Sequence, residues 1–440
     1  MRALRFSAVV ASTAIGLALG ACRTVPVEAP RGTRAERVET DAGAGGDARL
    51  ALGAVDGNRT DFFATEKLAA RTDAERAAWG AYRSESARLG ESDRALVEAE
   101  LRALHRTTMT RAPFQKAFQL DESMTDEWFH GDKAGHLADN MLSFQTPSGG
   151  WSKHVDYEPS PRQPGESFYS ETDSWQYIAT VDNDSTTEQL RFMARAFAAR
   201  GDVRYRNAFG RGIEYLLRAQ FPNGCWPQVF PLQGGYHDAG TFNDNAIINV
   251  LSLLRDVAAG QFDFVPQMLR AEASASVDRG TSCILESQTK IGGVLAVWAQ
   301  QVDPLTLAPV SARSYELAGQ SGRESAVIVA YLMAMPSPSP RVVEAVHAAI
   351  AWFKAHQIFG YEYDSYALRK VEGAGPLWSR LYELDTDRPI FSNRDGVKRY
   401  DWNELTDRRR GYMWFTKEPR APLAAYDGWA KGHPRATSAQ

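Results

Sequence analysis

Cysteine and histidine are scarce in this chain, which has three of the former and eight of the latter among 440 residues. Neither HExxH nor G-x-S-x-G occurs, because the run from Gly319 to Gly322 reads GQSG. A metalloprotease zinc site and a hydrolase with a nucleophilic serine therefore have little support. The formal net charge of −4 gives no bulk attraction to nucleic acid or to an anionic membrane, so we expect no nucleic-acid partner.

The N-terminus has the pattern of a processing segment. Two arginines precede an apolar run over residues 8–19, which is too short for a membrane span, and residues 19–22 read LGAC. This ending resembles the bacterial lipobox. It implies removal of residues 1–21, lipidation of Cys22 and export to the bacterial outer membrane, on its periplasmic or cell-surface face. An ordinary cleaved secretory signal is the alternative.

Few large apolar residues follow the signal, as expected of a flexible tether. At Thr72 a helical pattern begins with a capping box completed by Glu75, and a second helix is expected over residues 91–105. The chain is thus divided into a signal segment (1–21), a tether (22–60), a helical extension (61–110), a main body (111–430) and a C-terminal tail (431–440).

One phrase occurs three times, in which a hydrophobic helix end leads through glutamine into a glycine turn. The copies are MLSFQTPSGGW at 141–151, LLRAQFPNGCW at 216–226 and ILESQTKIGGV at 284–294. Successive glutamines are separated by the length of two helices with their connections, which predicts helical hairpins around a common axis. Trp151 and Trp226 are either core residues that hold the turn or platforms on which sugars stack.

Sparse strand signals and helical periodicity predict an all-α ring of paired antiparallel helices, with a loop-rich tail after residue 357. The expected pairs are 186–200 with 204–220, 244–259 with 265–288, and 322–335 with 341–356. Cys225 and Cys283 each lie close to a repeat glutamine and can be neighbours. A disulfide and two buried free thiols remain equal alternatives, because the sequence does not fix their distance.

The loops before the first helix of each pair would meet at one end of such a ring. They read VDNDSTTE at 181–188, YHDAGTFNDNA at 236–246 and SARSYELAGQSGRES at 311–325. Together they contribute Asp182, Asn183, Asp184, His237, Asp238, Asn243, Asp244, Asn245, Arg313, Tyr315 and Glu316. Oxygen ligands without cysteine favour Ca²⁺ or Mg²⁺. The first loop is no EF-hand, because Thr187 stands where glycine is required.

Structural roles compete with this interpretation. Ser185 with Glu188, and Ser321 with Glu324, match the capping box, so we assign them to helix starts. Asn243 is either a helix N-cap or a ligand contact.

The charged residues also have simpler alternatives. Asp182 and Asp244 could merely favour the positive ends of helices, although their place before consecutive inner helices favours a shared site. Arg313 could be a plain ion-pair partner of Glu316.

Several long blocks occur in order over roughly residues 105–415. They read GGWSKHVDY, VDNDSTTEQLRFMARAF, YLLRAQFPNGCWPQVFPLQGGYHDAGTFNDNA, LAPVSARSYELAGQSGRES, and RPIFSNRDGVKRYDWNEL with RRRGYMW. In these blocks the chain resembles the pectate lyases of polysaccharide lyase family ten.

The resemblance implies an incomplete toroid of three α/α hairpins beside an irregular, loop-rich lobe, with a calcium-dependent active site in the groove between them. Residues 111–430 would form the catalytic domain. The substrate would be polygalacturonate, the de-esterified pectin backbone. We expect a monomer that touches the membrane only through its lipid anchor.

Carried over residue by residue, the resemblance assigns three central roles. Asp182 would be the active-site aspartate of the DN motif, Asp244 the calcium-binding aspartate of NDN, and Arg313 the proton-abstracting arginine of ARxYEL. Asp182 and Asn183 would join Asp244 at the calcium ion. The substrate would be held by Asn183, Lys153, Tyr315, Arg388, Arg394 and Lys398.

The chain departs from the expected family pattern beside this site. Ser152 and His154 stand where proline and asparagine are expected, Asp184 where glycine is common, and Ala318–Gln320 where proline-serine-leucine is usual. These departures affect subsite preference more than reaction type.

The implied reaction is a β-elimination that removes the C5 proton of a uronate, which becomes more acidic when Ca²⁺ neutralises the carboxylate. Arg313 would be the Brønsted base, although arginine ordinarily stays protonated in proteins. Two rivals remain: a glycoside hydrolase with two carboxylates on the same toroid, and a non-catalytic lipoprotein that binds oligogalacturonides.

Overall fold

The computed structural model describes residues 61–170 and 178–435. The predicted signal segment, the tether and the lipidation site at Cys22 lie outside these residues, so the predictions for them stay predictions. Among the helices in the described part of the chain, none is long and apolar enough to cross a membrane.

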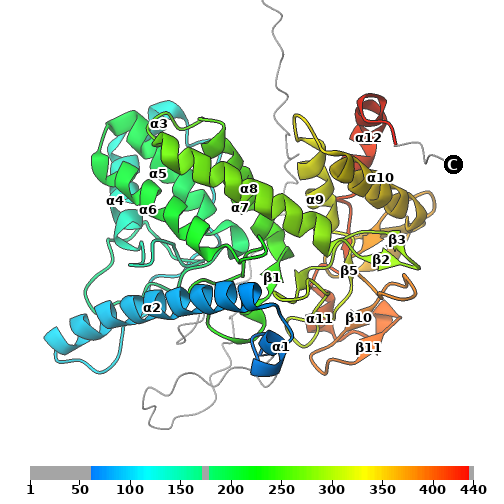
Figure 1. The fold of residues 1–440 in the computed structure, drawn as a ribbon, viewed down its shortest axis with the longest axis horizontal. Coiled ribbons are helices and arrows are strands. Elements are labelled where there is room, and N and C mark those ends of the chain that lie inside the picture. Colours follow the sequence, from blue (N-terminus) through cyan, green and yellow to red (C-terminus); the bar gives the residue numbers. More distant parts are fainter. Residues whose placement is uncertain (1–60, 171–177, 436–440) are drawn as a thin grey trace, which may run out of the picture. The chain divides into compact units, whose positions relative to one another are not determined.

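The helices follow one another in chain order from α4 to α10 (Figure 1), and their contacts arrange them in two rows. The inner row is α5 (Thr187–Arg200), α7 (Ala246–Ala258) and α9 (Glu324–Met333), and the outer row is α4 (Asp132–Ser143), α6 (Val203–Ala219), α8 (Gln267–Ser287) and α10 (Pro340–Ala355). Each inner helix pairs with the outer helix that follows it, and neighbours within a row also touch. The all-α fold with its three predicted hairpins is confirmed.

The ring does not close. At one end of the inner row α3 (Asp126–His130) packs against α5, and at the other end α12 (Arg420–Gly432) packs against α9 and α10. The architecture is therefore an incomplete toroid.

The repeat glutamines tie successive outer helices together. Each side-chain amide donates to a carbonyl oxygen of its own turn and to one of the next outer helix. These bonds, at 2.8–3.1 Å, join Gln145 to Gly149 and Ala208, Gln220 to Gly224 and Ser276, and Gln288 to Ala296 and Ala345. The repeated phrase thus encodes the junction between neighbouring hairpins.

The tryptophans of the repeats belong to the same scaffold. Trp151 and Trp226 are 0% exposed, and their indole N–H groups donate to Met141 O and Leu216 O, each at 2.8 Å. Their interpretation as core residues is confirmed, and the sugar-stacking alternative is wrong. Trp298, which follows the third copy of the repeat, makes the corresponding bond to Ile284 O of α8 at 2.7 Å.

Cys225 and Cys283 form a disulfide, with their Cα atoms 5.4 Å apart. The bond links the turn after α6 to α8, which decides between the two alternatives that the sequence left open.

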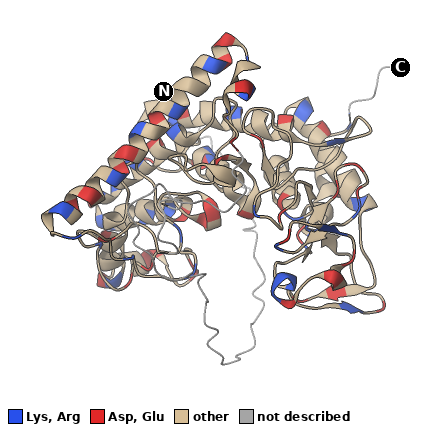
Figure 2. Cartoon of the chain, turned by 90° about the horizontal axis from the view of Figure 1, so that it is seen from below, with Lys and Arg blue, Asp and Glu red and all other residues tan. Residues whose placement is uncertain are grey.

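The helical extension contains α1 (Thr65–Ala69) and α2 (Asp73–Ala103), and the predicted capping box is present at the start of α2. A separate helix over residues 91–105 is wrong, because α2 is one continuous helix of 31 residues. Its buried residues recur every three or four positions from Trp79 to Leu101, so one unbroken stripe packs on the ring. Charges of both signs alternate along the helix (Figure 2).

Short strands accompany the ring. They are β1 (Gly240–Thr241) paired with β4 (Gln301–Val302), and the hairpin of β2 (Lys290–Ile291) with β3 (Val294–Leu295). All these pairs are antiparallel and only two residues long, as the sparse strand signals predicted.

The chain after α10 forms the predicted irregular lobe. Its elements are β6 (Tyr361–Tyr363), β7 (Leu368–Lys370), β8 (Trp378–Ser379), β9 (Leu381–Tyr382), β10 (Phe391–Ser392), β11 (Lys398–Arg399), α11 (Asp407–Arg410) and β12 (Phe415–Thr416). The pairs are β6 with β7, β8 with β12, and β10 with β11. The lobe has its own core around Leu377, Phe391, Trp402 and Trp414.

One strand pair joins this lobe to the ring. β5 (Gln320–Ser321), which leads into α9, pairs with β9 in the register Gln320 to Tyr382 and Ser321 to Leu381. The lobe is thereby fixed beside the loops that precede the inner helices.

Candidate functional site

Two short loops lie against each other before α5 and α7. They are η2 (Asp182–Asp184) and η4 (Asn243–Asn245). Both visit the left-handed region, with φ of 49° at Asn183 and 48° at Asp244. Asparagine and aspartate tolerate this region better than most residues do. Such strained backbone clusters at functional sites, where the surrounding structure holds it.

The first loop ends at Thr186, a β-branched residue at φ 63°. Its Oγ1 accepts a hydrogen bond from Trp151 N at 3.0 Å, which ties the loop to the repeat turn. The predicted capping box of Ser185 with Glu188 is wrong, because Thr186 is the N-cap of α5 and its side chain caps nothing. Glu188 instead accepts from Leu120 N at 3.0 Å.

The second predicted capping box is only half formed. Ser321 Oγ accepts from Glu324 N at 3.3 Å at the start of α9. The Glu324 carboxylate accepts from the Ser321 hydroxyl and, at 2.9 Å, from Arg380 Nη2, so it serves an ion pair and no backbone cap. Asn243 is no side-chain cap either, because its Oδ1 accepts from Arg380 Nη2 at 2.8 Å and from Gln300 Nε2 at 3.1 Å.

Asp182 is 4% exposed and pairs with Lys153, whose Nζ donates to Oδ2 at 2.8 Å. Within the described residues, Oδ1 has no well-formed hydrogen bond. Burial raises the pKa of Asp182, but Lys153, with smaller contributions from Gln228 and Arg313, outweighs burial and lowers it below the ordinary value. Asp182 is therefore a buried carboxylate that is ionised.

Asp244 has the opposite electrostatic balance. Arg323 Nη1 donates to its Oδ1 at 2.9 Å, and Asn243 Nδ2 donates to its Oδ2 at 3.0 Å. Burial, and then the charge of Asp182, nevertheless raise the pKa of Asp244 above its ordinary value. Two carboxylates thus repel each other across adjoining loops, and a cation between them would relieve that repulsion.

The donor chemistry of these loops fits calcium, which prefers carboxylate and amide oxygens. The number of such oxygen ligands in these loops is small. No group of three or more His, Cys, Asp or Glu residues gathers as a metal cage within residues 61–170 and 178–435. Because Ca²⁺ takes roughly six to eight oxygen ligands, most of its shell would come from water and from a bound ligand.

Arg313 lies in the segment before β5, and its side chain is 45% exposed. The guanidinium forms a bidentate pair with Glu316, in which Nε donates to Oε2 at 2.7 Å, and it lies 5.0 Å from the ring centre of Tyr315. Burial lowers the pKa of Arg313, but the bond to Glu316 raises it by more, so the net shift is upward. The ion-pair alternative is therefore present, and Arg313 is protonated in the free protein.

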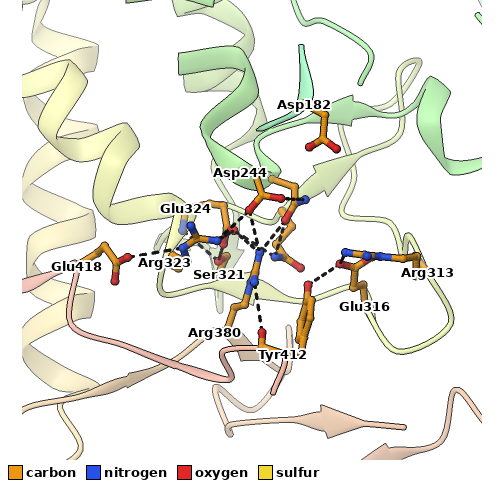
Figure 3. A network of polar contacts seen from close by, with 12 residues as sticks. Asp182, Asp244, Arg313, Glu316, Ser321, Arg323, Glu324, Arg380, Tyr412 and Glu418 are labelled. Carbon is orange, nitrogen blue, oxygen red and sulfur yellow. Dashed lines mark hydrogen bonds and ion pairs between the residues drawn. The ribbon is translucent and has the colours of Figure 1, made fainter. Parts of the chain in front are cut away.

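Arg380 is a site residue that the sequence analysis missed. It lies between β8 and β9, and its side chain is 3% exposed. Besides Glu324 and Asn243 it lies 3.7 Å from Asp244 Oδ1, so it reaches from the second lobe into the loop before α7 (Figure 3). A charged residue within the apolar run from Leu377 to Tyr382 was the available signal, since such residues are buried only when paired.

Tyr412 extends this network toward Arg313. Its ring centre lies 4.5 Å from Arg380 Cζ, and its hydroxyl donates to Glu316, the partner of Arg313 (Figure 3). Asp244 and Arg313 are thus connected through Arg380 and Tyr412 of the second lobe and through Glu316.

The predicted substrate-binding residues fall into different settings. Tyr315 is 5% exposed, and Arg409 Cζ lies 3.6 Å from its ring centre, so the ring supports Arg313 from within the protein. Lys398 Nζ pairs with Glu383, and Arg388 Cζ lies 3.9 Å from the ring centre of Tyr400.

Arg394 is exposed, in the turn between β10 and β11. In the same turn, a Cβ on Gly396 would lie 3.4 Å from Ser314 O. The turn of Arg394 is therefore next to the segment that carries Arg313, whereas Lys398 and Arg388 are engaged elsewhere in the lobe.

The family model described as pectic acid lyase matches residues 145–421. Among solved structures, the chain is similar to a family 10 polysaccharide lyase from Cellvibrio cellulosa, with 31% sequence identity and a TM-score of 0.61, over 72% of this chain and 99% of that chain. A mutant of the family 10 lyase from the same organism, in complex with trigalacturonic acid, matches with the same identity and TM-score over 72% of this chain and 100% of that chain. A comparison with curated proteins found no match. The chain therefore belongs to the pectic acid lyase family and is a pectate lyase.

Proposed function

We propose that this chain cleaves polygalacturonate by calcium-dependent β-elimination, with Arg313 as the Brønsted base. The observation that carries the proposal is the meeting of Asp182 and Asp244 on adjoining loops, with Arg313 close enough for its charge to lower the pKa of Asp182. The solved lyase in complex with trigalacturonic acid supports this substrate class.

Asp182, Asn183 and Asp244 would hold the calcium ion. When bound, the ion supplies positive charge that neutralises the uronate carboxylate and makes the C5 proton more acidic. In the free protein Lys153 and Arg323 neutralise the two aspartates and compete with a cation for them. We therefore expect calcium affinity to be low until a substrate carboxylate adds its own oxygens.

In the elimination the C5–H bond breaks and its electron pair forms the C4=C5 double bond, while the C4–O4 bond breaks toward oxygen. Arg313 accepts the C5 proton, and water protonates O4. The pair with Glu316 opposes this role because it favours the protonated guanidinium. A neutral guanidine, or a hydroxide ion that Arg313 orients, is needed, and alkaline pH favours both.

The test is a time course of ultraviolet absorbance on polygalacturonate, with calcium and with EGTA. An absorbance rise that needs calcium is expected, because the product carries a conjugated double bond. New reducing ends without absorbance would identify the two-carboxylate hydrolase, and binding without either product would identify the non-catalytic oligogalacturonide-binding protein.

We also propose that the chain is an outer-membrane lipoprotein, because residues 19–22 read LGAC as in a lipobox. We propose that it is a monomer, from its resemblance to the family ten pectate lyases. Cys22→Ser should abolish fatty-acid labelling and release the protein from membranes. A labelled Cys22→Ser protein would refute the anchor, and a mass by light scattering above that of one chain would refute the monomer.

A further inference from the structure

The segment from Phe114 to Gln119 contacts two loops of the candidate site, the one that contains Lys153 and the one that contains Asp182. Phe114 forms an antiparallel bridge with Val155, and Gln115 N donates to His154 O at 3.0 Å. Further on, Gln119 Nε2 donates to Asp184 Oδ2 at 2.9 Å. The segment from Phe114 to Gln119 is therefore fixed at both ends to the rim of the candidate site, and it lies outside the region that the family model matches, which begins at residue 145.

Phe114 presents a large apolar surface on this rim. Its side chain is 57% exposed, and its ring meets the ring of His154 edge to face, with the centroids 5.6 Å apart. A single exposed apolar residue needs no explanation in itself. This one differs because its backbone is held by a β-bridge and its ring rests against a second ring, so little conformational freedom is lost when a ligand covers it.

The neighbours of Phe114 connect it to the charged centre. His154 follows Lys153, whose ammonium group binds Asp182 at 2.8 Å. His154 has φ 62° and stands where asparagine is expected for the family, so the second ring of the pair belongs to a residue in which this chain departs from the pattern. Lys116, two residues after Phe114, is exposed and adds positive charge to the same rim.

We propose that Phe114, backed by His154, is an outer saccharide subsite that stacks against a galacturonate ring beyond the two sugars flanking the cleaved bond. The axial oxygen at C4 of galacturonate leaves the C3, C4 and C5 hydrogens as an apolar patch on one ring face, which suits an exposed phenylalanine. The positive charge of the exposed Lys116 would attract the uronate carboxylates. The inference deepens the proposed function and rests on it for the substrate class.

The experiment compares Phe114→Ala, Phe114→Trp and Phe359→Ala, the last removing a phenylalanine of similar exposure, 60%, from the second lobe before β6. For Phe114→Ala we expect KM on polygalacturonate to rise about three- to tenfold, as for loss of one aromatic contact. The effect should shrink as the substrate shortens from hexagalacturonate to trigalacturonate. Phe114→Trp should retain the wild-type KM, and Phe359→Ala should match the wild type.

His154 is a positioning residue, and His154→Asn tests it with a side chain that also tolerates a positive φ. We expect a smaller rise in KM with the same dependence on substrate length. A rise in KM that is the same for every substrate length would show that His154 has a merely structural role. Equal KM values for Phe114→Ala and Phe359→Ala would overturn the subsite.

Binding of hexagalacturonate by calorimetry, in the Arg313→Ala protein with and without Phe114→Ala, separates this inference from the lyase proposal. Affinity that depends on Phe114 would uphold the subsite even if no ultraviolet product formed. If the protein forms the ultraviolet-absorbing product but its affinity for hexagalacturonate does not depend on Phe114, the subsite is refuted and the lyase proposal is supported.

Discussion

Arg380 Nη2 donates to Glu324 Oε1 at 2.9 Å, and the two side chains are only 3% and 1% exposed. Arg380 belongs to the second lobe, whereas Glu324 begins the inner helix α9. The pair therefore fastens the lobe to the ring beside Asp244. A buried ion pair adds little net stability, but a charge left buried without its partner is strongly destabilising.

Arg380→Met should lower the free energy of unfolding by as much as about 3–5 kcal/mol, because the buried Glu324 carboxylate loses its hydrogen-bonded cation and keeps only the cation of Arg323, whose Nη1 lies 3.7 Å from Oε1. Combining it with Glu324→Gln should recover part of that loss, since the remaining group is then neutral. Urea unfolding measures all three proteins. Lys398→Met, which breaks a surface pair with Glu383, is the control, and a loss for Arg380→Met no larger than for this control would contradict the interpretation.

Asp244→Asn keeps the size of the side chain and an oxygen for Arg323, but removes the charge that a cation would use. We expect the calcium concentration for half-maximal activity to rise by more than about tenfold, since even indirect ligand losses cost that much. Titration of activity after EGTA treatment measures it. Asp256→Asn removes a carboxylate from a surface pair at the far end of α7, and an equal shift there would argue against a metal role for Asp244.

The ring could be predicted from sequence because its junctions repeat. Glutamine and glycine recur after each of α4, α6 and α8, and every copy makes the same bonds, as in Gln145 to Ala208 and Gln220 to Ser276. The loops could then be found by counting forward from each copy, which located Asp182 and Asp244.

Other features depend on contacts that no local pattern records. Ser185 and Glu188 have capping-box spacing, but the Glu188 carboxylate accepts a hydrogen bond from the backbone N–H of Leu120, which is distant in sequence. Arg380 acquires its role only when the pairing of β5 with β9 brings the second lobe to α9. The continuity of α2 likewise follows from its packing on the ring, because that contact outweighs local signals for a break near Gly90.

Arg313→Ala should remove nearly all activity while the calcium dependence of substrate binding stays similar, and near-normal turnover would rule out the assigned role.

The pair with Glu316 raises the pKa of Arg313, so a higher pH is needed to populate its unprotonated form. Glu316→Gln removes that charge and lowers the pKa of Arg313. If Arg313 is itself the base, the rise of kcat/KM with pH should move to lower pH.

The control for this shift is Tyr412→Phe, which deletes the other hydrogen bond to Glu316 but keeps its carboxylate. Its profile should stay near that of the wild type. An unmoved profile for Glu316→Gln would indicate that Arg313 orients hydroxide and does not itself take the proton.

Asp93 anchors α2 to the first repeat turn, where its Oδ1 accepts from Ser148 N at 2.7 Å. Burial raises its pKa from 3.8 to about 6. Between these values the folded protein binds more protons than the unfolded chain, so this carboxyl group lowers stability as pH rises and has no further effect above its folded-state pKa. The energy involved is about 2–3 kcal/mol.

Asp93→Asn keeps the acceptor for Ser148 N and cannot ionise. The free energy of unfolding of the wild type minus that of Asp93→Asn should therefore fall by about 2–3 kcal/mol between pH 4 and pH 7, measured by urea unfolding. Asp73→Asn, which removes an exposed carboxylate from the same helix, is the control. A difference that stays constant with pH would mean that Asp93 is solvated in the folded protein, and hence that α2 is not docked at this turn in solution.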